Sequence, residues 1–504
     1  MRIEPSEAAF AEIYASDKPT VVWTTTVADL ETPVAAYIKL CSQRDHTFLL
    51  ESVEGGATRG RYSMIGFDPD LVFRAHGEAG EINRQFASDR NAFVPVEGRS
   101  FDALKALIHE SEFTLPPGLP PMSAGIFGYL GYDMVRQMER LGAPNPDVVG
   151  LPDAILVRPR TVLIFDSVKD EITIVSQVRP SEGVSAKLAY GAAVNRISDV
   201  LDALDKPVDK SLNSDDIAMT APMTSNTSEA EYLAMVEKAK DYIAAGDIFQ
   251  VVLSQRFEAP FSLPPFALYR ALRRVNPSPF LYFLDFGDFA VAGSSPEILV
   301  RVRDGDVTIR PIAGTRPRGK TAAQDAVYAK ELLADPKELA EHLMLLDLGR
   351  NDVGRVSEIG SVKVTEKFFL EYYSHVMHIV SNVVGRLSSR HDVLDALAAG
   401  FPAGTVSGAP KVRAMEIIDE LEKDKRGLYA GCVGYFSADG AMDTCICLRT
   451  SIIKDGKMYA QAGAGIVADS VPLSEQTECV NKSSALFRAA EEAVRFANAA
   501  RRGQ

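Results

Sequence analysis

The sequence lacks several features that would assign it to a specialised class of protein. Its few cysteines, spread over 504 residues, include no C-x-x-C pair and are too sparse for a disulfide framework. No apolar run approaches the roughly 18 residues of a membrane span, and the first ten residues have no apolar core of a signal peptide. We therefore expect reduced thiols in a cytoplasmic protein that does not interact with membranes. The cysteines are Cys41, Cys432, Cys445, Cys447 and Cys479.

The chain also lacks an excess of positive charge. Its 54 Lys and Arg residues stand against 68 Asp and Glu residues, which gives a formal net charge of −14. This acidic balance, with no long basic run, argues against nucleic-acid binding as the main task. An anionic substrate would have to be held by a local cationic site or by a metal ion.

The hydrophobic content of 46% indicates a globular protein with a large core. Internal repeats and low-complexity tracts are absent, and the length suits about two or three domains. The polar stretch 204–228, rich in Asp, Ser, Thr and Pro, is typical of a linker. We expect an N-terminal domain over residues 1–203, a linker over 204–228 and a second domain over 229–504.

The strand-like runs come in groups and do not alternate with helices, which favours an α+β fold. Before the linker, Thr161–Phe165 and Glu171–Val178 read as a hairpin. After it, Ser228 and Glu231 predict a capping box for a helix that ends near Gly246. Further strands are predicted at Phe249–Leu253, Phe280–Phe286, Phe289–Ala292, Ile298–Val302, Val307–Ile312 and Met458–Ala462. Further helices are predicted at Ala322–Ala334, Pro336–Leu348, Val393–Ala399, Val412–Leu421 and Leu473–Asn498.

One segment imitates a nucleotide-binding loop. Gly314–Thr321 satisfies the pattern GxxxxGK[ST] and lies between a predicted strand and a predicted helix. However, Arg316 and Arg318 crowd a loop whose backbone amides would have to wrap a phosphate, and Pro317 has no amide hydrogen to offer. Because the pattern itself matches, a P-loop NTPase is kept as an alternative hypothesis despite these objections.

Two acidic pairs are candidates for a metal site. Glu338 and Glu341 lie three residues apart, and Glu475 and Glu478 repeat this spacing, so each pair projects from one helix face. Four carboxylates from two helices suit a hard cation such as Mg²⁺. The alternative is ordinary helix capping, because Asp335 and Glu338 fit the N-cap and N3 positions of a capping box.

Further polar residues are candidates for binding and proton transfer. Arg449 lies in a mostly apolar run that predicts a partly buried strand, and Lys482 lies one helical turn beyond Glu478. A buried cation needs a carboxylate or an anionic ligand as its partner. His375 and His378 offer a general acid or base, or else core histidines.

At these residues the sequence resembles the chorismate-utilising enzymes and, within them, the anthranilate synthase group. The resemblance covers nearly the whole chain and is most specific beyond Ser228. It rests on the segments Gly246–Arg256, Ser294–Glu297, Arg310–Gly319, Glu341–Asp352, Phe401–Lys411, Gly463–Val467 and Glu478–Lys482. The P-loop match overlaps one of these segments and is thereby explained as a coincidence.

Two positions distinguish the reactions of this family. Gln250 stands where isochorismate-forming members carry a lysine base that activates water, and Ala313 stands where aminodeoxychorismate synthases typically carry a lysine. The resemblance therefore implies a lyase of tryptophan biosynthesis that converts chorismate and ammonia to anthranilate and pyruvate. An aminodeoxychorismate synthase-type enzyme is the alternative. The implied fold is a large antiparallel β-sandwich with helices packed outside.

The resemblance also implies roles for individual residues. Glu341 and Glu478 would bind Mg²⁺ directly, and Glu338 and Glu475 would act through water. Glu297 would donate a proton to the leaving hydroxyl, and His378 would assist pyruvate loss. The substrate would contact Thr405, Tyr429, Arg449, Gly463, Ala464, Gly465 and Lys482.

Finally, the resemblance implies regulation and a partner. Tryptophan would inhibit the enzyme from a pocket with Glu51 paired to its ammonium, formed by Leu50, Glu51, Ser52, Asn276, Pro277 and Ser278. A separate glutamine amidotransferase subunit would deliver the ammonia, because the sequence contains no cysteine-nucleophile glutaminase segment.

Overall fold

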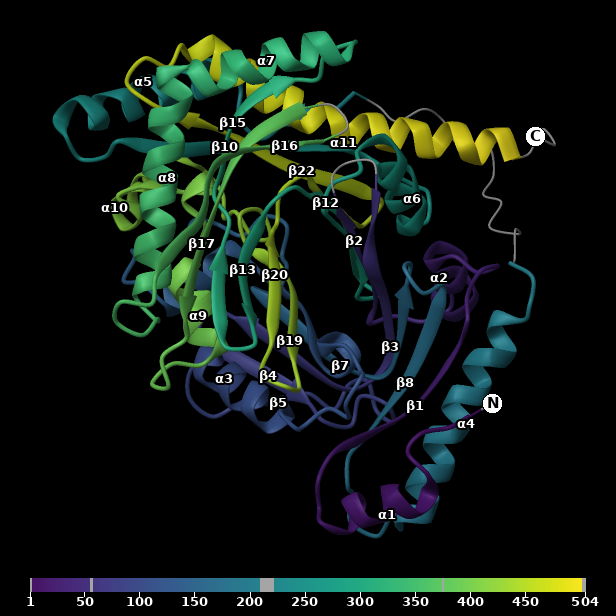
Figure 1. Ribbon diagram of the computed structural model, residues 1–504. Helices are drawn as coiled ribbons and strands as arrows, with labels where there is room; N and C mark the ends of the chain where they lie inside the picture. The colour runs from purple at the N-terminus through teal and green to yellow at the C-terminus, as the bar shows by residue number, and fades with distance from the viewer. Residues whose placement is uncertain (1, 55–57, 209–221, 374–375, 501–504) are drawn as a thin grey trace.

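Two long paired strands of the N-terminal half connect the other series of strands. In the computed structural model, which describes residues 2–54, 58–208, 222–373 and 376–500, β3 (Thr58–His76) pairs with β7 (Ala154–Asp166) over most of its length. Two series of hydrogen-bonded strands, here called arm 1 and arm 2, extend from this pair (Figure 1). Every strand pairing in the described ranges is antiparallel, as an α+β fold of this type requires.

Arm 1 runs from β7 through strands of both halves of the chain. In order of pairing it contains β6 (Gly125–Leu130), β19 (Cys432–Ser437), β20 (Met442–Ile446), β13 (Ile298–Arg303), β14 (Asp306–Ile309), β17 (Val376–Arg386), and then β15 (Ile312–Pro317) and β16 (Lys363–Tyr372), which both pair with β17.

Arm 2 runs from β3 in the same way. In order of pairing it contains β2 (Thr47–Glu54), β11 (Phe280–Asp285), β12 (Phe289–Ser295), β21 (Thr450–Lys454), β22 (Lys457–Ile466) and β10 (Gln250–Pro260), which also pairs with β9 (Thr224–Ser225) and β18 (Gly408–Ala409). Beside β3 and β7 lie β1 (Thr20–Val27), β4 (Ala79–Asn83), β5 (Val94–Pro95) and β8 (Glu171–Val178).

The two halves of the sequence share both arms. β2 of the N-terminal half pairs with β11, and β6 pairs with β19, so two strand ladders join the described parts of the halves. The domain boundaries at 203 and 229 remain predictions about the sequence. Of the expected linker, residues 209–221 lie outside the described residues; α4 (Ala186–Leu204) precedes it and α5 (Glu229–Ala245) follows it.

A shared apolar core lies between the arms. Phe48 on β2 stacks on Phe127 on β6 with ring centroids 4.5 Å apart, and Tyr282, Val291 and Tyr435 belong to the same buried cluster. Burial of such aromatic and aliphatic surface holds the two arms together at roughly 25 cal/mol per Å². The arrangement is the antiparallel sandwich that the sequence predicts.

Helices cover the outer faces of the sandwich. A second buried cluster packs α1 (Glu7–Ala15), α2 (Pro33–Cys41), α4, α6 (Pro265–Val275) and α11 (Pro472–Ala500) against arm 2 and β8. A third packs α3 (Ser100–Ser111), α8 (Pro336–Gly354) and α9 (Val393–Gly400) against arm 1. α7 (Ala322–Ala334) joins α8, and α10 (Lys411–Leu421) packs on β10. No helix in the described part of the chain has the length and apolar character to span a membrane.

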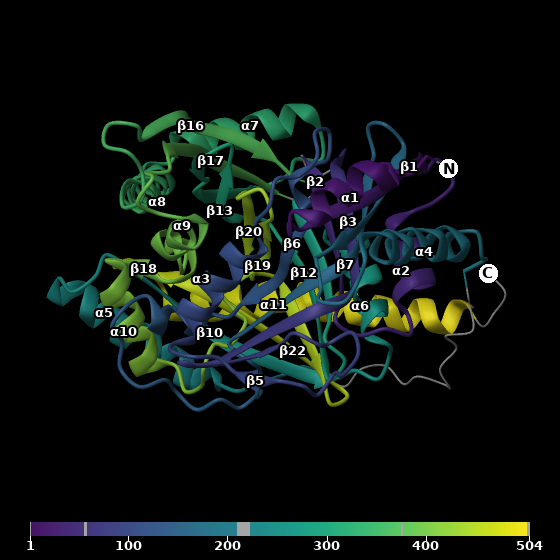
Figure 2. The same cartoon turned by 90° about the horizontal axis from the view of Figure 1, so that it is seen from below.

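The helix ends follow the sequence signals closely. Ser228 and Glu231 form the predicted capping box of α5, and Gly246 ends the helix in the left-handed conformation with φ of 84°. α5, α8 and α10 gather at one end of the molecule, and α1 and α4 lie at the opposite end (Figures 1 and 2).

Three local expectations are wrong. The strand predicted at Val307–Ile312 is two strands, β14 and β15, because the chain bends at Arg310 and Pro311, and Pro311 has no amide hydrogen for a ladder. Arg449 follows β20 and precedes β21, where a strand residue was expected. The P-loop match is also wrong: its first residues form β15, which pairs with β17, and Thr321 is the N-cap of α7.

Candidate active site

The predicted catalytic residues gather where the chain crosses from one arm to the other. Glu297 lies between β12 of arm 2 and β13 of arm 1, and Arg449 lies between β20 of arm 1 and β21 of arm 2. His378 comes from β17 and Thr405 from the short 3₁₀ helix η3 (Gly404–Val406). Strands end or bend at these crossovers, so their side chains and backbone groups are available to a ligand.

Glu297 is a buried carboxyl group whose described neighbours include no basic partner. Its side chain is 7% exposed, and the Thr405 hydroxyl donates to both of its oxygens at 3.2 and 3.3 Å. Burial raises the pKa of Glu297 to about 8, against the lowering effect of the Thr405 hydrogen bond. At pH 7 the group is therefore mostly a neutral acid that can donate a proton.

Arg449 is the cationic residue of the second crossover. Its backbone adopts φ of 48°, a left-handed conformation that is uncommon outside glycine. Burial lowers the pKa of its guanidinium, and among the described residues no carboxylate forms an ion pair with it. A desolvated guanidinium of this kind favours an anionic ligand.

His378 lies beside Arg449 and is neutral. Burial, followed by the charge of Arg449, lowers the pKa of His378 to about 4. Its Nδ1 lies 3.2 Å from the carbonyl oxygen of Gly314 and 3.0 Å from the Thr315 hydroxyl. Because a carbonyl can only accept, Nδ1 is assigned the proton, and Nε2 keeps the lone pair of a base.

A glycine-bearing strand forms another wall. In β22, Gly463 pairs with Ser254 and Gly465 with Val252 of β10. A Cβ on Gly463 would lie 2.9 Å from the Tyr429 hydroxyl oxygen, so glycine is required for that hydroxyl to approach the strand. Tyr429 is itself buried.

The residues next to Gly463 in this wall contact different parts of the protein. A Cβ on Gly465 would lie 2.5 Å from Nε2 of Gln250, which donates to Glu341 at 3.3 Å. The side chain of Ala464 points into the apolar cluster under α5 and α10, so only its backbone is available to a ligand. Lys482 on α11 donates to the carbonyl oxygen of Gly463 at 2.9 Å and pairs with Glu478 at 2.6 Å.

The four predicted metal ligands lie on α8 and α11, whose N-terminal regions are linked by the Lys337–Asp469 ion pair at 3.0 Å. Burial, followed by the charges of Glu338 and Glu478, raises the pKa of Glu341. Burial and the charge of Glu478 raise the pKa of Glu475. Carboxylates from both helices therefore share one acidic region.

The donor set fits a magnesium ion that retains water ligands. Carboxylate oxygens are the hard ligands that Mg²⁺ takes, usually one or two at a time. Among residues 2–54, 58–208, 222–373 and 376–500 no three ligand-type side chains converge closely enough to enclose a metal. Glu338 pairs with Arg316 at 2.6 Å, and Glu478 pairs with Lys482. The assignment of these four residues to a metal stays a prediction.

Several residues of the site were not singled out by sequence reasoning. The Tyr373 ring packs edge-on against His378 with centroids 5.4 Å apart, and its hydroxyl donates to Glu371 at 2.7 Å. Arg316 on β15 bridges Asp335 and Glu338. Arg316 lies within the false P-loop match, so its charge was the sequence signal that could have indicated the contact with Asp335 and Glu338. His375, the other histidine of the predicted pair, lies outside the described residues.

A cavity of about 850 Å³ lies between the two arms and reaches the candidate site at Pro296 and Tyr373. Leu50, Glu51 and Ser52 line it, as the sequence analysis expects for an effector pocket. Asn276, Pro277 and Ser278 do not line it; Pro279 to Tyr282, the next residues of the chain, do. Arm 1 contributes side chains from β19 and β20, among them Tyr435 and Asp443.

The pairing of Glu51 with the ammonium of tryptophan stays a prediction, and in the structure Glu51 has internal partners. Its carboxylate accepts two hydrogen bonds from Arg273 on α6, at 2.6 and 2.9 Å, and a further one from the Tyr269 hydroxyl. These internal partners occupy both oxygens that the sequence analysis assigned to an incoming ammonium. Arg273 comes from a helix far along the chain, so no local pattern predicted this pair.

Comparisons with known proteins agree on one family. The chorismate binding enzyme family matches residues 45–488. Anthranilate synthase component 1 of Cereibacter sphaeroides is 56% identical over 98% of this chain and 99% of its own length. The protein of the same name from Pseudomonas aeruginosa is 48% identical over 92% of this chain and 94% of its own length.

Solved structures show the same fold. The crystal structure of anthranilate synthase component I from Streptococcus pneumoniae has a TM-score of 0.75 and 37% identity, covering 92% of this chain and 99% of that one. The menaquinone-specific isochorismate synthase MenF of Escherichia coli has a TM-score of 0.70 at 20% identity, covering 96% and 99% of the two chains. The second likeness concerns the fold alone.

Proposed function

The chain belongs to the chorismate binding enzyme family and is a chorismate-converting enzyme of the lyase type, and on this premise we propose that it joins ammonia to chorismate to give anthranilate and pyruvate. The observation that carries the proposal is Gln250. It occupies the position where the sequence analysis expects a lysine base in water-adding members, and its amide donates to Glu341. Ammonia is a nucleophile that needs no such base.

Glu297 is the proposed general acid. Ammonia attacks C2 of chorismate while the C4 hydroxyl leaves, and a neutral hydroxyl is a poor leaving group unless it is protonated. The pKa of Glu297, raised by burial to about 8, supports this role because the group still carries its proton at pH 7. Thr405 fixes the orientation of the carboxyl group through its hydroxyl.

The two carboxylates of chorismate require different partners. We assign the enolpyruvyl carboxylate to Arg449, whose guanidinium has no carboxylate partner among the described residues, with Tyr429 and the Gly463–Gly465 backbone beside it. We assign the ring carboxylate to the acidic region of α8 and α11. Bound there, Mg²⁺ would neutralise that carboxylate, with Glu341 and Glu478 as ligands and Glu338 and Glu475 acting through water.

His378 is the proposed base for the second stage. The aminodeoxyisochorismate that the amination produces must lose pyruvate to become aromatic: a ring proton is removed, the bond between the ring and the enolpyruvyl oxygen breaks, and the released enolpyruvate takes up a proton to become pyruvate. The neutral imidazole, with its proton held on Nδ1 by Gly314, presents Nε2 as the acceptor. Tyr373 packs against the ring and restricts its orientation.

Regulation and ammonia supply are finer parts of the proposal. The cavity between the arms is the proposed tryptophan site, with Glu51 in its wall as the proposed partner of the ammonium and Arg273 holding the Glu51 carboxylate in place. Tryptophan bound between the arms can change the relative stability of two arrangements of the crossovers. A separate glutamine amidotransferase component is proposed to supply the ammonia, as the designation component 1 of the relatives suggests.

One assay tests the central proposal. Purified protein is mixed with chorismate, ammonium and Mg²⁺, and anthranilate is followed by its fluorescence. Aminodeoxychorismate or salicylate as the product would overturn the assignment. Lys320→Ala is the matched control for the P-loop alternative: its side chain makes no contact with the site, so anthranilate formation should be unchanged, whereas an NTPase would lose nucleotide binding.

A further inference from the structure

The walls of the proposed chorismate site are supported by one buried ion pair behind them. Arg426 and Glu422 lie in the segment between α10 and β19, with side chains only 1% and 5% exposed. We propose that this pair positions Thr405, Tyr429 and the Gly463 strand for chorismate, a role that rests on the function proposed above. Neither residue touches the substrate in this proposal, so both are positioning residues.

Two parallel hydrogen bonds join the guanidinium of Arg426 to the carboxylate of Glu422. The Nε of Arg426 donates to Oε2 of Glu422 at 2.9 Å, and Nη2 donates to Oε1 at 2.6 Å. Removing two charges from water is costly, and a buried pair is often no more stabilising than apolar residues of the same size. Its remaining hydrogen bonds, which all reach backbone or side chains next to the site, indicate a positioning role.

The first of these bonds supports the general acid. Nη1 of Arg426 donates to the carbonyl oxygen of Val406 at 2.7 Å. Val406 follows Thr405 in η3, and the Thr405 hydroxyl donates to Glu297. The guanidinium therefore fixes the turn from which Thr405 reaches the acid.

The second group of bonds supports the glycine-bearing strand. Nη2 of Arg426 donates to the carbonyl oxygen of Val252 at 2.6 Å, and Oε1 of Glu422 accepts from the amide and the hydroxyl of Ser254 at 2.8 and 2.9 Å. Ser254 and Val252 are the β10 partners of Gly463 and Gly465. The pair thus fixes β10 opposite the strand that we assign to the substrate carboxylate.

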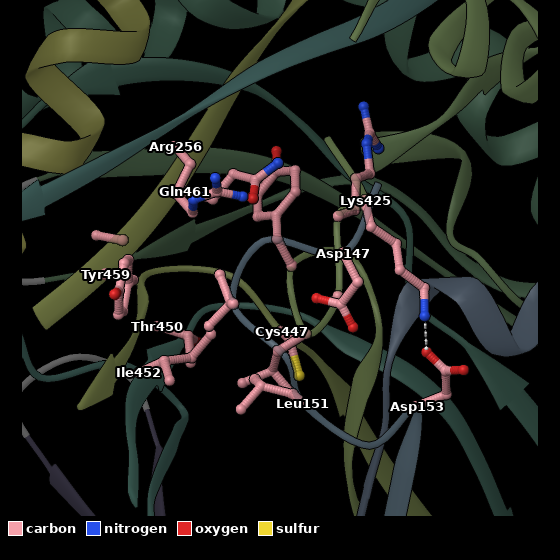
Figure 3. Close-up of a pocket in the computed structure, with 16 residues that line it drawn as sticks. Asp147, Leu151, Asp153, Arg256, Lys425, Cys447, Thr450, Ile452, Tyr459 and Gln461 are labelled. Atoms are coloured by element: carbon pink, nitrogen blue, oxygen red, sulfur yellow. Dashed lines mark hydrogen bonds and ion pairs between the residues drawn. The ribbon is translucent and has the colours of Figure 1, made fainter. Parts of the chain in front are cut away.

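The third contact supports Tyr429. The guanidinium carbon lies 5.4 Å from the centroid of the Tyr429 ring, within the range of a cation–π interaction. Arg426 and Tyr429 also line a small cavity. Figure 3 shows this cavity between Asp147 and Asp153 on one side and Thr450 and Tyr459 on the other. Because the cavity leaves the Tyr429 ring incompletely packed on this side, we expect the contact with Arg426 to contribute strongly to the position of the ring.

Only arginine suits this arrangement. Its planar guanidinium supplies donors in three directions, to Glu422, Val406 and Val252 at once. A lysine at this position would keep the charge but place its donors on a single nitrogen. Arg426→Lys therefore removes the positioning while it preserves the net charge.

The test compares Arg426→Lys with Arg158→Lys. Arg158 is also buried, with a side chain 8% exposed, and forms a two-pronged ion pair with Asp70 at 2.9 Å, but it lies on β7 in the N-terminal half. We expect Arg426→Lys to raise the KM for chorismate about tenfold or more and to lower kcat. Arg158→Lys should change neither at a temperature where both variants are folded. Equal kinetics in the two variants would overturn the proposal.

A double-mutant cycle with Thr405→Val separates positioning from general weakening of the fold. If Arg426 acts through Thr405, the effects on kcat/KM are not additive; additive effects contradict the proposal. Should Arg426→Lys fail to fold, Ser254→Ala takes its place, because it removes one bond to Glu422 and should raise KM without loss of folding; an unchanged KM overturns the proposal. A wild-type protein that makes no anthranilate would instead overturn the proposed function.

Discussion

Two buried glutamates show how differently this molecule uses the same side chain. Glu297 at the crossover between the arms and Glu51 at the cavity between the arms are 7% and 6% exposed. Glu297 accepts side-chain hydrogen bonds from a hydroxyl, whereas Glu51 is held by Arg273 and a tyrosine. The first environment keeps a proton on the carboxyl group and suits an acid; the second suits a charged structural link.

The same contrast applies to the cations. Arg273 forms an ion pair with Glu51, whereas Arg449 has no carboxylate partner among the residues that the structure describes. Burial alone therefore does not identify a functional group. The presence or absence of an internal partner separates the substrate site from the structural pair, and each of the following experiments changes one side of this comparison.

The largest expected effect is on the acid. Glu297→Gln keeps the size of the side chain but removes the transferable proton, so kcat should fall about 10²- to 10⁴-fold. The free energy of unfolding should change little, because no ion pair is lost. Steady-state anthranilate fluorescence and urea denaturation provide the two measurements. A variant with full activity would exclude Glu297 as the acid.

The converse change is expected at the structural pair. Glu51→Ala leaves the guanidinium of Arg273 without its partner, so the free energy of unfolding should fall by about 3 kcal/mol. Ammonia-dependent turnover should persist at temperatures where the variant is folded. Urea denaturation at pH 7 measures the loss of stability. An unchanged free energy of unfolding would mean that the ion pair of Glu51 with Arg273 does not stabilise the fold.

The cavity adds a regulatory readout to this comparison. In the double variant Glu51→Ala, Ser52→Ala the wall of the cavity is altered while the crossover residues are intact, so tryptophan should inhibit about tenfold less strongly. Glu297→Gln should bind tryptophan as the wild type does. Titration of anthranilate formation with tryptophan tests the first statement and calorimetry the second; unchanged inhibition of the double variant would place the effector elsewhere.

The acidic region should respond to loss of a ligand. Glu341→Gln removes one charged oxygen donor and should raise the Mg²⁺ concentration for half-maximal activity about 10- to 100-fold. Glu331→Gln on α7, an exposed position outside the region, is the matched control. An unchanged Mg²⁺ requirement in the Glu341 variant would contradict the assignment of this ligand.

The smallest effect concerns pH. Since burial raises the pKa of Glu297 to about 8, the acid loses its proton above that value and kcat should fall about tenfold per pH unit. The folded pKa lies above the reference value of 4.5, so its contribution to stability is complete below pH 4.5 and is lost as pH rises through 8. A pH–rate profile without an alkaline limb would contradict the role of Glu297.

Local signals in the sequence predicted much of the fold. The capping box at Ser228 and Glu231 and the glycine after α5 gave that helix its ends, because capping depends only on neighbouring residues. The grouped strands predicted an α+β fold, and the resemblance to the chorismate-utilising enzymes implied the antiparallel sandwich. The break between β14 and β15 was missed: Pro311 has no amide hydrogen for the ladder, and the two segments pair separately with β17, which lies far along the chain.

The amino-acid sequence establishes which chemical groups are present: carboxyl groups at helical spacing, a glutamine in place of a lysine, and an acidic chain that needs a local cation for an anionic substrate. How these groups are used depends on the folded arrangement. It paired Glu51 with Arg273, left Glu297 without a basic partner among its described neighbours, and placed Arg426 behind three walls of the site. Partners of this kind come from distant segments, and their charges act through space and burial, which no local pattern records.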